Sequence, residues 1–255
     1  MLHFIEKNSI IKVMNRSFSG KKALVVGGSG GIGAAISVKL AEAGAEVFVH
    51  GGRSQERLDR VLETIRSRNG TAQGFLYPGD RPDSAREILS RAPAPDILVC
   101  SWGPFIQKPL SAMEPGEWER IVRDNLIFPG IMISLVINDM INKNWGRIIL
   151  LGGTNTSTIR GFSTTAAYSS AKTALGVLAK SAAKQAGPFG VTCNVVCPGL
   201  VDTEYVDEAM RNYIRQHSPG GRIQKPGEIA EFVSVLLEQD QINGAIIPID
   251  YGLSL

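Results

Sequence analysis

Two side chains four residues apart in the sequence, Tyr168 and Lys172, have the types and the spacing for acid–base chemistry. The run that they open continues to Lys184 with no proline and a single glycine, so we expect a helix there. Residues four apart lie on one helical face, so the phenol and the ammonium would point into the same space. A neighbouring positive charge favours the phenolate and should lower the pKa of Tyr168 from its ordinary value near ~10. Such a phenol can exchange a proton with a carbonyl or alcohol oxygen, although the same spacing also fits an exposed amphipathic pair.

A glycine-rich loop near the N-terminus has the sequence context of a phosphate-binding turn. It follows a short apolar run, Ala23 to Val26, that fits a strand buried on both faces, and it leads into a helical pattern that stops at Gly44. Glycines let the backbone approach a pyrophosphate, and the start of the helix offers free N–H groups. The alternative is a glycine-rich turn without a ligand. The candidate cofactor contacts in this loop are Gly27, Ser29, Gly30, Gly31, Ile32 and Gly33.

The end of the next expected strand, Glu46 to His50, bears on which dinucleotide would bind. In dinucleotide-binding folds an acid at this place binds the ribose 2′-hydroxyl of NAD, whereas an arginine accommodates the 2′-phosphate of NADP. The strand is followed by two glycines, Arg53 and Ser54, with no acid. This favours NADP over NAD, with Arg53 and Ser54 as contacts. The alternative is that Arg53 is simply solvated at the start of a helix over 54–68.

The remaining pattern alternates strands with helices along the chain, which predicts an α/β fold with a doubly wound parallel sheet of the Rossmann type. We expect one domain over residues 20–255, an N-terminal extension over 1–19 and a lid-like excursion over 200–225. A long helix over 118–142 should bend or break at Pro129 and Gly130. The further strands expected are 71–77, 96–100, 147–151, 191–196 and 245–249, and the last helix is 226–238.

Composition excludes several other classes of protein. The 255 residues are 44% hydrophobic and 20% charged, with a net charge of +3, which is typical of a globular domain and too mild for a nucleic-acid binder. Three cysteines form no C-x-x-C pair and three histidines are scattered, so we expect no metal site and reduced thiols in the cytoplasm. The most apolar stretch, 125–137, is too short to span a membrane and fits a buried helix.

Taken in order, these segments resemble the short-chain dehydrogenase/reductase family over roughly residues 20–252. The glycine loop is similar to its T-G-x-x-x-G-x-G motif with Val26 in the threonine place, and the Tyr168 pair matches its Y-x-x-x-K. The stretch from Asn194 to Thr203 resembles its N-x-x-x-P-G-x-x-x-T segment. The overall pattern looks like the reductases of 3-oxoacyl chains on acyl carrier protein.

The resemblance implies a role for each matching residue. Tyr168 would be the general acid/base, Lys172 would lower its pKa and hold the nicotinamide ribose, and Asn125 would support a water relay to Lys172. Asp80 stands in the place of the acid that flanks the adenine. The substrate would be a small carbonyl or alcohol, and the protein would form a homotetramer or dimer through helices around 118–142 and 166–186. The further cofactor contacts implied are Ser101, Trp102, Gly103, Pro198, Gly199, Val201 and Thr203.

The sequence departs from the family pattern at two places. The N-N-A-G motif is replaced by Cys100 to Gly103, so Trp102 would narrow the nicotinamide side, stack on a ligand, or serve as an ordinary packing aromatic. The family's catalytic serine is also missing. Counting forward from the fifth strand reaches Gly153, whereas counting back from the tyrosine reaches Asn155. Thr154 is the candidate substitute, and the residues that stand behind it are Asn155, Thr156 and Ser157.

Two functions stay open at this point. The first is an NADP(H)-dependent oxidoreductase that transfers a hydride between nicotinamide and a ketone or secondary alcohol. The second is a nucleotide-binding protein of the same fold with weak or no catalysis, which the missing serine favours. Enoyl reductases of the superfamily are set aside because the residue seven before Lys172 is Thr165 rather than tyrosine. Extended-type sugar epimerases are also set aside, because they usually carry a longer C-terminal domain than this sequence offers.

Overall fold

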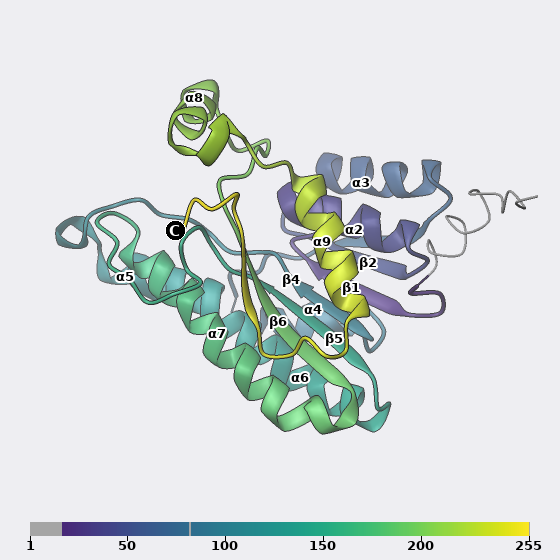
Figure 1. The fold of residues 1–255 in the computed structure, drawn as a ribbon. Helices are drawn as coiled ribbons and strands as arrows, with labels where there is room; N and C mark the ends of the chain where they lie inside the picture. The colour runs from purple at the N-terminus through teal and green to yellow at the C-terminus, as the bar shows by residue number, and fades with distance from the viewer. Residues whose placement is uncertain (1–16, 82, 255) are drawn as a thin grey trace, which may run out of the picture.

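A seven-stranded parallel sheet forms the centre of the molecule, with the strand order β3-β2-β1-β4-β5-β6-β7 (Figure 1). The computed structural model describes residues 17–81 and 83–254, so most of the expected extension over 1–19 lies outside the described residues. Phe18, at the end of that extension, is only 2% exposed and packs in the core. The expected doubly wound α/β fold is confirmed. The strands are β1 (Lys22–Val26), β2 (Glu46–Gly51), β3 (Thr71–Leu76), β4 (Ile97–Cys100), β5 (Gly146–Leu151), β6 (Val191–Pro198) and β7 (Ile246–Ile249).

Helices cover both faces of this sheet because its central strands are apolar on both sides. In β1, Val25 belongs to one buried cluster and Leu24 to the other. Figure 1 shows α2, α3 and α9 gathered on one side of the sheet, with α6 and α7 on the other. The first layer consists of α2 (Gly31–Glu42), α3 (Gln55–Ser67) and α9 (Pro226–Glu238), and the second of α4 (Ser84–Ser90), α5 (Pro115–Val122), α6 (Phe128–Asn142) and α7 (Ala166–Ala186).

The long helix expected over 118–142 is interrupted earlier than predicted. A π-helical segment, η2 (Arg123–Ile127), separates α5 from α6, and Pro129 lies in the first turn of α6. The combined stretch, residues 115–142, is long and apolar enough to cross a membrane by length and composition, but half of its 18-residue apolar window is buried inside the protein. Met132 and Met140, both fully buried, show α6 acting as a core helix.

The carboxyl ends of the parallel strands meet at one edge of the sheet. Between β1 and β4 the chain winds away in opposite directions, and this switch point is where open α/β sheets bind ligands. The excursion after β6 contains α8 (Glu208–His217), which Figure 1 shows standing apart from the two layers.

Candidate active site

The loop after β1 is folded too tightly for side chains. Gly27 and Gly31 have φ angles of +77° and +51°, in the left-handed region that favours glycine. A Cβ built on Gly33 would lie 2.2 Å from the carbonyl oxygen of Gly27. The N-cap of α2 is Gly30, which has no side chain to accept the first N–H groups of the helix. The loop is therefore shaped to leave the N-terminus of α2 open to an acceptor from elsewhere.

His50, at the end of β2, holds this loop in place. The Gly27 N–H donates to Nδ1 of His50 at 3.2 Å, and Nε2 lies 2.8 Å from the carbonyl oxygen of Tyr77. These partners assign the proton to Nε2 and make the ring neutral. Burial lowers the pKa of His50 to about 4, against the opposing effect of its bond to Tyr77. In the sequence this histidine is one of three scattered histidines, and its position at the end of a buried strand was the available signal for its role.

The residues expected at the adenosine end come together beside β2 and β3. A terminal guanidinium nitrogen of Arg53 lies 2.5 Å from a carboxylate oxygen of Asp80, and the Arg53 side chain is 76% exposed. Ser54 is the N-cap of α3, and its hydroxyl accepts the N–H of Arg57 at 3.3 Å. An exposed arginine at this place can meet a 2′-phosphate without breaking a buried contact.

Trp102 packs toward the same end of the crevice. A Cβ on Gly79 would lie 2.7 Å from its ring, and the ring meets Phe128 edge-on with centroids 5.2 Å apart. The N–H of Ser101 bonds the carbonyl oxygen of Val26 at 2.9 Å and so extends the pairing of β1 with β4. These contacts show Trp102 as a packing aromatic between Gly79 and Phe128.

Tyr168 and Lys172 lie on one face of α7, as the spacing predicted. The ammonium nitrogen of Lys172 lies 5.7 Å from the centroid of the tyrosine ring and donates to the carbonyl oxygen of Leu151 at 2.8 Å. The ring of Phe105, from the loop after β4, meets the Tyr168 ring edge-on at 5.0 Å. Lys172 is only 6% exposed and Tyr168 is half-buried, so the amine lies in a nearly dry place beside the phenol.

The expected lowering of the Tyr168 pKa is wrong for this structure. Burial raises the pKa of Tyr168 to about 12, and the buried Cys197 thiol acts in the same direction. Burial also lowers the pKa of Lys172 to about 8. Loss of water disfavours both charged forms. The Lys172 Nζ lies over the tyrosine ring and bonds the Leu151 carbonyl.

Asn125 lies in the π-helical segment and is fully buried. Its amide nitrogen donates to the carbonyl oxygens of Pro104 and Ile121 at 2.9 and 3.1 Å. Its side-chain oxygen is buried and has no hydrogen-bond partner among the described residues. A Cβ on Gly103 would lie 2.1 Å from that oxygen, which explains why this glycine is the one retained from the family motif. An unpaired buried oxygen needs a donor, so this site fits a bound ligand or water.

The loop after β5 lies against the phenol. A Cβ on Gly153 would lie 3.0 Å from the Tyr168 hydroxyl. The Thr154 hydroxyl donates to the carbonyl oxygen of Gly199 at 3.0 Å, and Thr156 is turned inward, bonding both the N–H and the carbonyl of Gly153 at 2.9 Å. Asn155 has a φ of +61°, and its side-chain oxygen is buried without a partner among the described residues.

The segment after β6 reaches across the sheet edge to the glycine loop. Gly199 follows Pro198 and pairs with Ile249, and Val201 forms a bridge with Gln224. The methyl of Thr203 would lie 3.5 Å from a Cβ on Gly31. Thr203 therefore lies beside the N-terminus of α2.

A family model described as short chain dehydrogenase matches residues 21–213. The chain belongs to this family. A 3-oxoacyl-[acyl-carrier-protein] reductase of Aquifex aeolicus is 30% identical, covering 94% of this chain and 100% of its own. A versicolorin reductase of Emericella nidulans is 29% identical, covering 93% and 97%. A solved 3-oxoacyl (acyl-carrier-protein) reductase of Agrobacterium tumefaciens with NADP bound has a TM-score of 0.87 and 29% identity, covering 98% and 99%.

This short-chain dehydrogenase is therefore an NAD(P)-dependent dehydrogenase or reductase that acts on C=O and CH–OH groups, as the resemblance implied. Its likeness to 3-oxoacyl-[acyl-carrier-protein] reductases is confirmed too. Relatives of similar identity carry names for different substrates.

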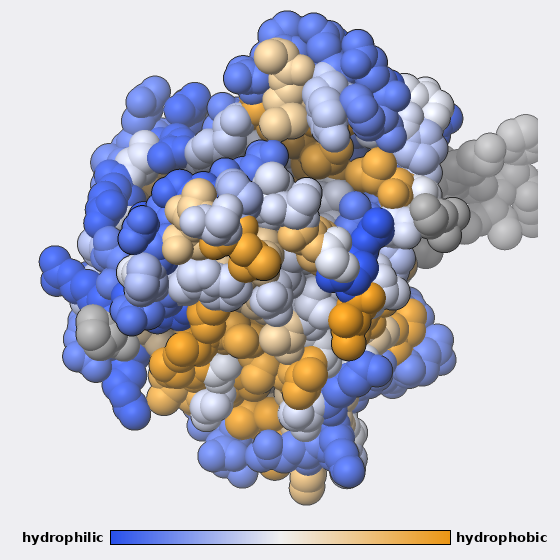
Figure 2. Space-filling model, turned by 90° about the vertical axis from the view of Figure 1, so that its left-hand side faces the viewer, coloured by the Kyte–Doolittle hydropathy of each residue, from blue (hydrophilic) through white to orange (hydrophobic). Residues whose placement is uncertain are grey.

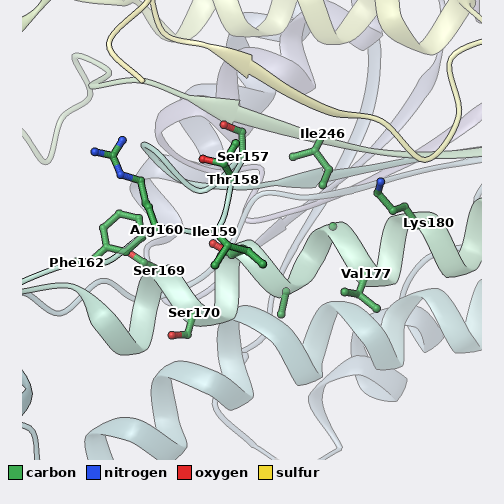
Figure 3. Close-up of a pocket in the computed structure, with 13 residues that line it drawn as sticks. Ser157, Thr158, Ile159, Arg160, Phe162, Ser169, Ser170, Val177, Lys180 and Ile246 are labelled. Carbon is green, nitrogen blue, oxygen red and sulfur yellow. The ribbon is translucent and has the colours of Figure 1, made fainter. Parts of the chain in front are cut away.

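A hollow of about 400 Å³ lies outside this crevice, on the outer side of α7 (Figure 3). The loop residues Ser157, Ile159 and Phe162 line it on one side, and Val177 and Ile246 line it on the other. Ser157 thus belongs to this outer surface. Within residues 17–81 and 83–254, no group of three His, Cys, Asp or Glu side chains could hold a metal ion.

Proposed function

We propose that the protein is an NADP(H)-dependent oxidoreductase that transfers a hydride between nicotinamide and a ketone or secondary alcohol. The observation that carries this proposal is the half-buried Tyr168 beside the buried Lys172, at the carboxyl edge of a sheet whose first loop is a glycine-lined helix N-terminus. NADP is favoured because β2 is followed by Arg53 and no acid. The Agrobacterium relative, which was solved with NADP, supports the same choice.

The residues present fit such a cofactor. The glycine loop gives room and N–H groups for the pyrophosphate, and Arg53 with Asp80 flanks the adenosine end. The unpaired oxygen of Asn125 and the buried ammonium of Lys172 provide polar groups at the other end. The bound cofactor supplies or accepts the hydride, and the chain's own residues position the reactants and handle the proton.

In the reduction direction Tyr168 is the proton donor in this proposal. With its pKa raised to about 12, the phenol keeps its proton at neutral pH and can give it to the oxygen that gains negative charge. Lys172 would favour the resulting phenolate once its ammonium turns from Leu151 toward the ligand.

The hydrogen bond that the family's serine would give must come from another group. Gly153 lies beside the phenol and has no side chain. We propose that Asn155 or Thr154 supplies it. We favour Asn155 because its side-chain amide nitrogen can donate, whereas the Thr154 hydroxyl already donates to Gly199. A second candidate function, cofactor binding with weak catalysis, is favoured by Gly153 alone.

We also propose a homotetramer or dimer formed through α6 and α7. Ile127 and Ile131, at the end of η2 and in α6, and Val177 in α7 are large apolar side chains that are exposed on these elements. Figure 2 shows apolar side chains gathered in the lower half of one face of the molecule. The three cysteines are free and buried, which supports the expected cytoplasmic location.

The test combines cofactor binding with turnover. Titration with NADPH and NADH should show tighter binding of NADPH, and a panel of ketones that includes a 3-oxoacyl thioester should be reduced. Tyr168→Phe should lower kcat by about 10²–10⁴ without weakening NADPH binding. Tyr213→Phe, at an exposed tyrosine of α8, is the matched control. Unchanged turnover in Tyr168→Phe would rule out the acid/base role.

A further inference from the structure

The N-terminus of α2 is bonded by an acid from a distant part of the chain. Both carboxylate oxygens of Glu204 accept the N–H of Gly31, at 3.0 and 3.1 Å. A Cβ on Gly30 would lie 2.7 Å from one of these oxygens. The first turn of α2, which is fully described, carries no acidic residue of its own. Glu204 thus provides the negative charge that a helix N-terminus favours.

The next residue closes over the same loop. The hydroxyl of Tyr205 would lie 2.8 Å from a Cβ on Gly30, and it accepts a hydrogen bond from the guanidinium of Arg57 at 2.7 Å. The Arg57 guanidinium also lies 5.5 Å from the centroid of the Tyr205 ring. A carboxylate, a phenol and an arginine, from two distant segments, therefore converge where a pyrophosphate would lie. We name Glu204 and Tyr205 the latch.

The latch and a dinucleotide need the same N–H group. The Gly31 N–H points at the Glu204 carboxylate, which resembles a phosphate in its charge and its acceptor oxygens. We propose that the latch is an internal competitor for the cofactor's pyrophosphate, and that it must leave the N-terminus of α2 before the dinucleotide binds. This inference rests on the proposed function, because it presumes that the glycine loop binds NADP.

Release of the latch should change the position of α8. Asp207, two residues after the latch, caps α8 by accepting the N–H of Met210 at 2.8 Å. Asp202, two residues before Glu204, pairs with Arg211 of α8 at 2.7 Å. Asp202 and Asp207 flank the latch, and both bond residues of α8. Displacement of the latch should therefore move α8 as well. Cofactor binding and the position of the proposed lid are thereby coupled.

The decisive measurement is the Kd of NADPH for wild type, Glu204→Gln and Glu208→Gln. Glutamine keeps the length of Glu204 but removes the charge that holds it on α2, so NADPH should bind about 2- to 10-fold more tightly. Glu208→Gln removes one charge from the same segment, where its carboxylate pairs with Arg211 and Arg215, and should leave the Kd within about 2-fold of wild type. Tyr205→Phe, which loses the bond to Arg57, should act in the same direction as Glu204→Gln.

Hydrogen–deuterium exchange gives a second readout that does not depend on the variants. NADPH should raise exchange of the wild-type backbone over residues 203–206. Equal or weaker NADPH binding by Glu204→Gln, with wild type still binding, would refute the latch and leave the proposed function standing. If no variant bound NADPH or NADH, the proposed function would be lost, and the latch with it.

Discussion

Acidification should destabilise this protein through His50. The ring is fully buried, and Nδ1 must be unprotonated to accept the N–H of Gly27. Protonation would place two N–H donors face to face and break the contact that holds the glycine loop. The pKa of His50 is about 4 in the folded protein, against an ordinary value of 6.5.

The sign and the size follow from these two values. Between pH 6.5 and pH 4 the unfolded chain binds a proton at this histidine and the folded protein does not, so the free energy of unfolding falls as the pH falls. Each pKa unit corresponds to about 1.4 kcal/mol, which gives a total loss of about 3 kcal/mol below pH 4. Lowering the pH from about 7 to about 5 should remove about 2 kcal/mol of this.

The assay is urea unfolding, followed by circular dichroism at pH 7, 6 and 5, for wild type and His50→Asn. Asparagine can keep an acceptor near the Nδ1 position but does not titrate, so the variant should lose about 2 kcal/mol less than wild type over this range. His217→Gln, at the exposed last residue of α8, should lose as much stability on acidification as wild type. If wild type and His50→Asn lost the same stability, the argument from the buried imidazole would be refuted.

Two further predictions concern the cofactor and the missing serine. Arg53→Ala should raise the Kd of NADPH about 10- to 100-fold and leave that of NADH unchanged, because only NADPH offers a 2′-phosphate for a charged hydrogen bond. Isothermal titration with both cofactors measures this, and an equal loss for both would contradict the assignment. Asn155→Ala should lower kcat/KM for ketone reduction by about 10²-fold or more, whereas Thr154→Val should change it by less than about 3-fold. The reverse order in steady-state kinetics would assign the donor to Thr154.

The sheet and the glycine loop could be predicted because their sequence signals are local. β1 is apolar on both faces and runs straight into glycines, and the spacing of Tyr168 and Lys172 placed both on α7. The π-helical segment around Asn125 could not be placed, because an extra residue in one turn leaves no mark in a helical pattern. The pKa direction of Tyr168 was missed because it depends on how much water the fold removes, which residue spacing does not report.

At the N-terminus of α2, likewise, the sequence reveals the local feature but not the distant residue that contacts it. The sequence identified an open helix N-terminus from the glycines that precede it, and physical reasoning requires some acceptor for its N–H groups. What the sequence could not identify was that acceptor, because Glu204 lies 173 residues from Gly31. In the proposed arrangement, a segment expected to contact the cofactor thus occupies the cofactor's place in the free protein. We therefore expect the affinity for NADPH to depend on Glu204 as well as on the glycines, and a binding site judged from its own loop alone would be assigned too high an affinity.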